Sequence, residues 1–210
     1  MTAPLREPPA LHDRALQDLS FIRRTMEGAA SFTDVPGWGL VATGASALAA
    51  AAIAAAQPTA GGWLAVWMLE ALLGVTLGGS SMWRKMRRRV PAGAGPVLTA
   101  PARKFLFGFW PAILAGAVLT FALTDFTALL APAGEVPAVL PGLWLLLYGL
   151  GVLTAGAFSV RTVPAMGAAF MVLGSLALLV PGIPGDVTLA IGFGGLQVVF
   201  GAIIARRHGG

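Results

Sequence analysis

The chain has 210 residues, of which 57% are hydrophobic and only 11% are charged, and its mean hydropathy is +0.80. A chain of this length cannot bury so much apolar surface in its own core, because surface area falls too slowly relative to mass. The composition therefore excludes an ordinary soluble domain, a disordered chain and a nucleic-acid-binding domain, despite the net charge of +5. The absence of cysteine excludes disulfides and thiol chemistry.

The first 35 residues form a polar segment that we expect to lie in the cytoplasm. Charged residues interrupt every apolar run before residue 30, so the segment is not a secretory signal peptide. Residues 11–30 nevertheless have a helical period. The apolar stripe of this period, about 80° wide, consists of Leu11, Ala15, Leu19, Ile22, Met26 and Ala29. We expect an amphipathic helix that lies on the membrane surface, covers the ends of the membrane helices or docks a partner.

Six later stretches are long and apolar enough to cross a bilayer as helices, which takes about 20 residues each. They are residues 38–56, 63–83, 105–124, 139–159, 162–180 and 187–205. The sequence therefore predicts an all-α membrane protein with six transmembrane helices, arranged as three consecutive helical hairpins. The transmembrane domain covers residues 36–205, and residues 206–210 form a cytoplasmic tail.

The distribution of basic residues predicts the orientation. All 14 Lys and Arg fall in the N-terminal segment, the loops after the second and fourth spans, or the tail. In a six-span chain these four regions share one side of the membrane, so we expect both termini to be cytoplasmic. The bias toward Arg, Ala, Gly and Pro is typical of a GC-rich bacterial genome and favours a bacterial inner membrane.

The second span contains an acidic residue, Glu70, about 10 Å below its outer end at the helical rise. Carboxyl groups at this depth are costly and often functional. Glu70 can relay protons, bind a cation when ionised, or tie two helices together by a hydrogen bond. Tyr148 lies at a similar depth in the fourth span, and Gln197 lies near the middle of the sixth. We therefore predict that Glu70, Tyr148 and Gln197 form one intramembrane polar site.

Other residues within the spans have structural interpretations. Gly74 and Gly78 form a Gly-x-x-x-Gly pattern, and glycines also mark the fourth and sixth spans. Small residues allow helices to approach closely in lipid, so these three spans are expected to face protein, within the bundle or in a homo-oligomer. We expect the hydroxyls of Thr43, Thr76, Thr120 and Thr154 to bond to their own helix backbones.

A basic run follows the second span. It consists of Arg84, Lys85, Arg87, Arg88 and Arg89. Such a run fixes topology and attracts anionic lipid, and it can also contact a cytoplasmic protein. No nucleic-acid reading module accompanies it, so we predict no direct nucleic-acid binding.

Motif searches identify no catalytic chemistry. The chain contains no His-Glu-x-x-His motif, no phosphate-binding loop and no Gly-x-Ser-x-Gly motif. His12 lies in the N-terminal segment, called here the leader, and His208 lies in the tail. Neither has metal-ligand neighbours at useful spacing. We therefore predict a protein that is not an enzyme and that uses no cofactor or metal.

Several segments resemble a family of uncharacterised six-span bacterial membrane proteins of acidobacterial type. The resemblance rests on residues 21–27 (FIRRTME), 32–37 (FTDVPG), 140–144 (LPGLW), 156–161 (GAFSVR) and 194–201 (GGLQVVFG). It implies six spans and a regulatory partnership at most. It supplies no functional residues, because the family has no established activity.

Two functions are consistent with these observations. The first is a non-enzymatic inner-membrane protein, such as a sensor, regulator or accessory subunit that engages a cytoplasmic regulatory protein. The alternative is a small transporter or channel that uses Glu70 as a proton or cation site. Sparse polarity within the spans favours the first, because transporters often carry more polar groups at the membrane midplane.

Overall fold

The computed structural model describes residues 16, 18–22, 32–89, 98–124, 139–180 and 182–208. Within these ranges the regular structure is almost entirely helical, which confirms the predicted all-α class. The helices are α2 (Gly37–Ala55), α3 (Ala60–Arg89), α4 (Ala100–Leu123), α5 (Val139–Gly156) and α6 (Thr162–Leu179), followed by α7 (Gly185–Leu189), a π-helical segment η3 (Ala190–Leu196) and α8 (Gln197–His208).

Six of the helices in the described residues are long and apolar enough to cross a membrane. Five are the single helices α2 to α6, and the sixth is the continuous run from α7 through η3 to α8. The chain therefore has the architecture of a multi-pass membrane protein, as the hydropathy of the sequence predicts.

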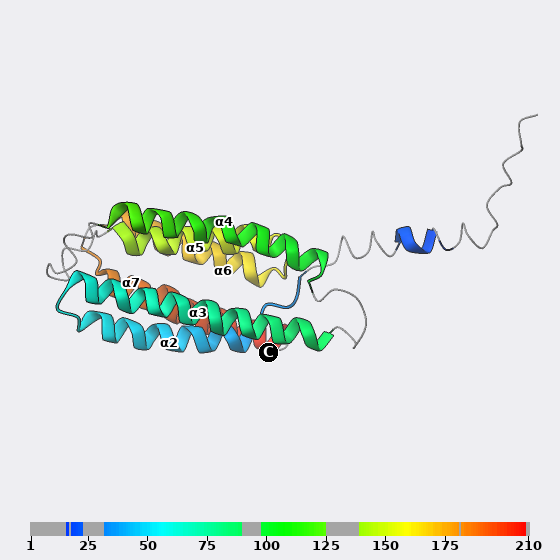
Figure 1. The fold of residues 1–210 in the computed structure, drawn as a ribbon, viewed down its shortest axis with the longest axis horizontal. Coiled ribbons are helices and arrows are strands. Elements are labelled where there is room, and N and C mark those ends of the chain that lie inside the picture. Colours follow the sequence, from blue (N-terminus) through cyan, green and yellow to red (C-terminus); the bar gives the residue numbers. More distant parts are fainter. Residues whose placement is uncertain are drawn as a thin grey trace, which may run out of the picture.

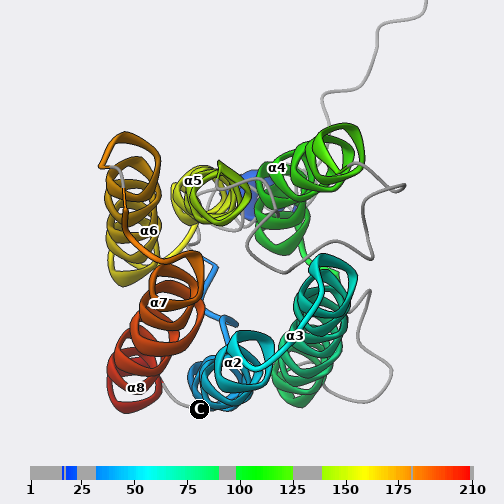
Figure 2. The same ribbon diagram turned by 90° about the vertical axis from the view of Figure 1, so that its left-hand side faces the viewer.

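The six spans form two layers of three, which run side by side along the long axis (Figures 1 and 2). In one layer α5 lies between α4 and α6, and in the other α2 lies between α3 and α8. The start of the sixth span joins the layers, since α7 contacts both α2 and α5. The first two hairpins pack along their lengths, whereas α6 makes most of its contacts with α5 and α8 makes most of its contacts with α2.

Glycines at seven-residue spacing bring α5 and α6 into backbone contact. A methyl group built on Gly149 of α5 would lie 2.7 Å from the carbonyl oxygen of Gly167 on α6. One built on Gly174 of α6 would lie 2.8 Å from the carbonyl oxygen of Gly142 on α5. Close van der Waals packing of this kind replaces the hydrophobic driving force, which is absent between helices in lipid.

The contact between α2 and the sixth span also depends on glycines at seven-residue spacing. A methyl group on Gly44 would lie 2.8 Å from the carbonyl oxygen of Gly194, and one on Gly201 would lie 2.9 Å from that of Gly37. These pairs are again seven residues apart on each helix. The first and last spans are thereby joined, and the prediction that glycines of the fourth and sixth spans face protein is confirmed.

The second span meets this prediction only in part within the bundle. A methyl group on Gly78 or Gly79 of α3 would meet nothing within 4 Å, although one on Gly74 would lie 3.2 Å from the Thr43 side chain. The reason is the position of α3 at the edge of its layer, where α2 is its main neighbour (Figure 2). Among the residues that the structure describes, Gly74 of the Gly-x-x-x-Gly pattern therefore contacts a neighbouring helix and Gly78 does not.

The second, third and sixth spans are longer than the apolar stretches predict. The basic run after the second span continues α3 as far as Arg89, and α4 begins at Ala100, before Arg103 and Lys104. Arg, Lys and Met are good helix formers, so a helix need not end where its apolar character ends. Thr99 caps α4 by accepting a hydrogen bond from the Ala102 N–H at 3.4 Å.

The described part of the N-terminal segment includes a short helical stretch at residues 18–22. Three residues of the segment, Leu16, Leu19 and Ile22, are each more than half exposed. The remainder of the predicted helix over residues 11–30 lies outside the described residues.

We predict that Gly149→Ala lowers the free energy of unfolding by about 1–3 kcal/mol, the usual cost of overpacking. The new methyl group would meet backbone atoms of Gly167 and Met171, both at 2.7 Å, so α5 and α6 would have to separate. Thermal unfolding of the protein in detergent measures the change.

Gly79→Ala is the matched control, because its methyl group would enter open space. Alanine also favours the helix by about 1 kcal/mol over glycine, so this variant should be as stable as the wild type or more stable. Equal destabilisation by both substitutions would contradict the proposed role of glycine at the contact.

Candidate functional site

A buried hydrogen bond joins two residues of the predicted polar site. The side-chain N–H of Gln197, at the start of α8, donates to the hydroxyl of Tyr148 on α5 over 3.4 Å. Gln197 is only 3% exposed, and within the described part of the chain its Oε1 atom has no hydrogen-bond partner. This polar pair therefore retains unused hydrogen-bonding capacity in the interior of the bundle.

Aromatic rings surround the pair. The Tyr148 ring lies 4.8 Å from that of Phe170 on α6, 5.1 Å from that of Phe193 on η3 and 5.7 Å from that of Phe109 on α4. The π-helical segment η3 ends directly before Gln197, and such segments are frequent near functional residues. The pair thus lies where the two layers meet, in an otherwise apolar setting.

Glu70, the third residue of the predicted site, has a different partner. Its Oε1 atom accepts a hydrogen bond from the Ser46 hydroxyl of α2 at 2.8 Å. Among the described residues Glu70 has no hydrogen bond to Tyr148 or Gln197. The structure therefore joins two of the three predicted residues, while Glu70 links α3 to α2. The Ser46 hydroxyl also lies 2.9 Å from the carbonyl oxygen of Thr43, one helical turn earlier in α2. The spacing of residues along the sequence does not predict the bond between Ser46 and Glu70.

The threonine hydroxyls follow the expected pattern. Thr43, Thr76, Thr120 and Thr154 each donate to a carbonyl three or four residues earlier in the same helix. Two of them also connect helices, because Thr154 lies 2.7 Å from the carbonyl of Gly108 and Thr120 accepts from the Trp144 indole at 2.7 Å. Both connections join α4 to α5.

A tryptophan cluster at the start of α3 is not apparent in the sequence. The indole N–H groups of Trp63 and Trp67 donate to one carboxylate oxygen of Asp186, over 2.6 Å and 3.4 Å. The Trp63 ring stacks on that of Trp144, with centroids 5.7 Å apart. Asp186 is more than 100 residues away in the chain, so only the folded arrangement shows that it closes this end of the bundle.

The Lys and Arg residues that the structure describes gather at one end of the bundle, called here the basic end (Figure 1). They are Arg84, Lys85, Arg87, Arg88, Arg89, Arg103, Lys104, Arg161, Arg206 and Arg207. The guanidinium of Arg87 lies over the ring of Trp83, 4.8 Å from its centroid. Arg89 is the last residue of α3, and its side chain lies outside the described part of the structure.

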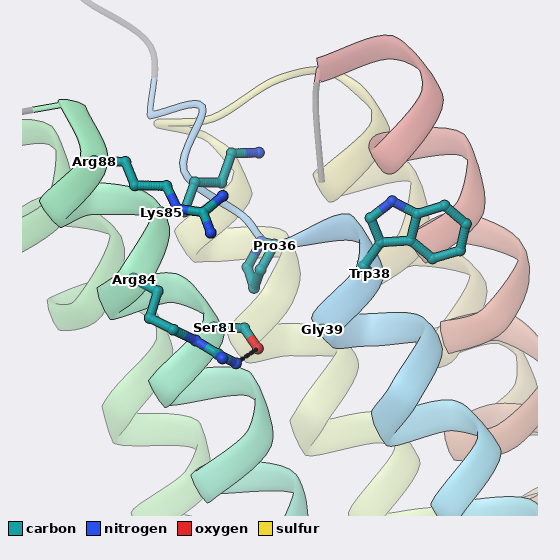
Figure 3. A pocket seen from close by; sticks show the side chains of 7 residues that line it. All are labelled: Pro36, Trp38, Gly39, Ser81, Arg84, Lys85 and Arg88. Carbon is teal, nitrogen blue, oxygen red and sulfur yellow. Dashed lines mark hydrogen bonds between the residues drawn. The ribbon is translucent and has the colours of Figure 1, made fainter.

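A pocket of about 260 Å³ opens at the basic end, between the start of α2 and the last turns of α3 (Figure 3). Its lining residues are Pro36, Trp38, Gly39, Ser81, Arg84, Lys85 and Arg88. Three members of the predicted basic run therefore share one pocket. Arg84 donates to the Ser81 hydroxyl at 3.3 Å.

Residues 32–36, the strap, fasten the N-terminal segment to the basic end. The Phe32 N–H donates to the carbonyl of Phe158, and the Ser159 hydroxyl donates to the carbonyl of Phe32, both at 2.6 Å. The Phe32 ring is 2% exposed and lies 4.8 Å from that of Phe105 on α4. Lys85 of α3 donates to the carbonyl of Val35 at 3.1 Å.

Lys85 also reaches the last span, because its ammonium group lies 3.2 Å from the carbonyl of His208. The strap is therefore tied to α4, to the connection between α5 and α6, and to α3, and through Lys85 to the end of α8. It crosses from one layer to the other before α2 begins (Figure 2).

Comparison with known proteins gives no functional assignment. No family model, curated protein or solved structure matches the chain.

We predict strong non-additivity between Tyr148→Phe and Gln197→Leu. Each single change leaves the other buried polar group without this hydrogen bond and should lower the free energy of unfolding by about 1–3 kcal/mol. The double variant removes both polar groups and should be closer to the wild type than the sum of the single variants. Thermal unfolding of all four proteins in detergent measures the coupling, and additive losses would contradict a direct Tyr148–Gln197 interaction.

Proposed function

We propose that this protein is a non-enzymatic sensor, regulator or accessory subunit of a bacterial inner membrane, and that it engages a cytoplasmic protein through its N-terminal segment. The observation that carries the proposal is the strap at residues 32–36. Its contacts to both layers connect the segment before Phe32 to the transmembrane helices.

The strap supports this role because it is a point where a local event can influence several helices. Phe32 is buried against α4 and bonded to the connection between α5 and α6. Displacement of the preceding segment would disturb these contacts first. A partner that binds the leader can thus bias the packing of the bundle, and a change in the bundle can alter the leader in return.

Exposed apolar side chains of the leader supply a contact surface. Leu16, Leu19 and Ile22 present their side chains to solvent in the described stretch. An amphipathic helix of this kind fits the apolar groove of a partner protein. Adsorption to the membrane surface is the competing outcome of the test below.

The location and orientation form part of the proposal. Placing the basic end in the cytoplasm satisfies the positive-inside rule for the Lys and Arg residues. Both termini would then be cytoplasmic, and the amino-acid composition supports a bacterial source. Membership of the acidobacterial-type family is proposed on the sequence segments alone.

We predict that Leu19→Glu combined with Ile22→Glu releases a specific soluble protein that co-purifies with the full chain in mild detergent. The two changes place charges on the apolar stripe, where burial in a partner groove would be costly. The matched control, Gln17→Glu with Arg24→Gln, alters charge on the opposite side of the predicted helix and should retain the partner. Quantitative mass spectrometry of the purified complexes measures the difference.

Coupling through the strap gives a second measurement in the same experiment. The partner should raise the thermal unfolding temperature of the wild type by mass action, and this rise should shrink in Phe32→Ala while binding persists. If no soluble protein depends on the leader, and the leader variants only weaken adsorption to vesicles, the partner proposal is wrong.

Transport is a second candidate because the Oε1 atom of Gln197 is buried beside Tyr148 and finds no hydrogen-bond partner in the described part of the chain. A water molecule or small polar solute would complete this pair. The separate position of Glu70, bonded to Ser46 between α2 and α3, favours a structural role for that carboxyl group. A regulatory or accessory subunit needs no proton pathway through the bundle, so a structural Glu70 is consistent with that role.

We predict that liposomes containing the wild type and the Glu70→Gln variant have the same proton flux, at the level of protein-free liposomes. A pH-sensitive dye inside the vesicles, with valinomycin to dissipate the membrane potential, measures the flux. Wild-type flux about tenfold above background and its loss in Glu70→Gln would instead assign a titrating role to Glu70.

A further inference from the structure

We propose that the pocket between α2 and α3 at the basic end binds the phosphate group of an anionic phospholipid. The inference goes beyond a protein partner, because it concerns a different surface and a different class of ligand. It rests on a concave site of about 260 Å³ in which three basic side chains of one helix face the start of another (Figure 3).

Two of the basic side chains in the pocket, Arg84 and Arg88, are close in sequence and carry the same charge. Arg84 and Arg88 lie four residues apart on the same face of α3, a spacing at which like charges repel. The described residues supply neither of them with an ion pair. Lys85 is directed to the carbonyls of Val35 and His208, which keeps its ammonium group at the wall of the pocket. An anion in the pocket would relieve the repulsion and accept charge-assisted hydrogen bonds.

The opposite wall adds to the positive potential. Gly39 and Trp38 belong to the first turn of α2, whose N-cap residue, Pro36, makes no side-chain capping bond. The first N–H groups of a helix lack partners within the helix and carry a partial positive charge. This helix end alone would define no site. Together with the guanidinium groups of α3 it completes a pocket that is positive on both sides.

The geometry also prepares one guanidinium group for binding. Arg84 donates to the Ser81 hydroxyl at 3.3 Å, and both residues line the pocket. This bond holds the long side chain toward the start of α2 (Figure 3). Because less conformational freedom is then lost on binding, the preorganised group binds a phosphate more tightly than a mobile one.

The position in the bundle indicates a lipid as the source of the phosphate. Trp38 is 63% exposed beside the pocket, and tryptophan is typical of the membrane–water interface. The pocket lies where the apolar part of α3 gives way to its basic end, which is the level of the head groups. Acyl chains of a bound lipid could then follow the face of α3 below the pocket, where Leu73 is exposed about three turns before Arg84.

Native mass spectrometry of the full chain in detergent tests the proposal, with phosphatidylglycerol as the probe. Arg84→Gln combined with Arg88→Gln should weaken binding of this lipid by about tenfold or more, since two charge-assisted hydrogen bonds are lost. The matched control is Arg103→Gln with Lys104→Gln. It removes the same charge at the same end of the bundle, from residues that do not line the pocket, and should change binding by less than about twofold.

A variant that keeps all charges tests the pocket even if the double variant fails to fold. Ser81→Ala keeps all basic residues but removes the oxygen that orients Arg84, so it should weaken phosphatidylglycerol binding by about threefold. Phosphatidylcholine should bind the wild type more weakly, because its choline group would bring a positive charge to the pocket.

The outcomes separate the sources of the anion. Weaker phosphatidylglycerol binding in the pocket variants, with binding retained in the control variant, supports the proposal. An equal loss of phosphatidylglycerol binding in the pocket and control variants would show that the lipid is attracted by the overall positive charge, and this result would overturn the proposal. Displacement of the lipid by millimolar inorganic phosphate would assign the pocket to a soluble anion and overturn the lipid assignment.

Discussion

Close backbone contact at glycine is the constraint on which this bundle depends. Lipid tails solvate apolar side chains as well as a protein interior does, so the helices gain little from burying leucine or valine against each other. Glycines seven residues apart allow α5 to contact α6, and α2 to contact the sixth span, at distances that a single methyl group would prevent. The two pairings fix the centre of each layer, and the remaining helices pack around them.

The few polar groups in the interior are placed by this packing. Ser46 and Glu70 bond where α2 meets α3, and Gln197 reaches Tyr148 where the sixth span meets α5. Each bond joins neighbouring helices, as expected where no water satisfies polar groups. These bonds hold neighbouring spans together, which is consistent with the regulatory or accessory role proposed above.

The basic end combines two features with separate physical origins. Hydrogen bonds from Phe32 and Ser159 and the burial of the Phe32 ring hold the strap in place. The positive charge of the pocket comes from Arg84, Lys85 and Arg88, which line it together with the start of α2. Lys85 belongs to both, because it lines the pocket and bonds to the strap at Val35. An occupied pocket and an engaged leader would therefore influence each other through one side chain.

The sequence by itself determined the all-α class, the six spans and the gathering of basic residues at one end, because hydropathy over 20 residues and the order of charges are properties of the linear chain. It also predicted the backbone bonds of the threonines, which are local. Only the tertiary structure decided that Glu70 pairs with Ser46, that Asp186 accepts from Trp63 and Trp67, and that Gly78 faces open space. These outcomes depend on which helix faces which and at what rotation. Residue spacing along one helix fixes neither, since the facing partners lie 24 to 123 residues away.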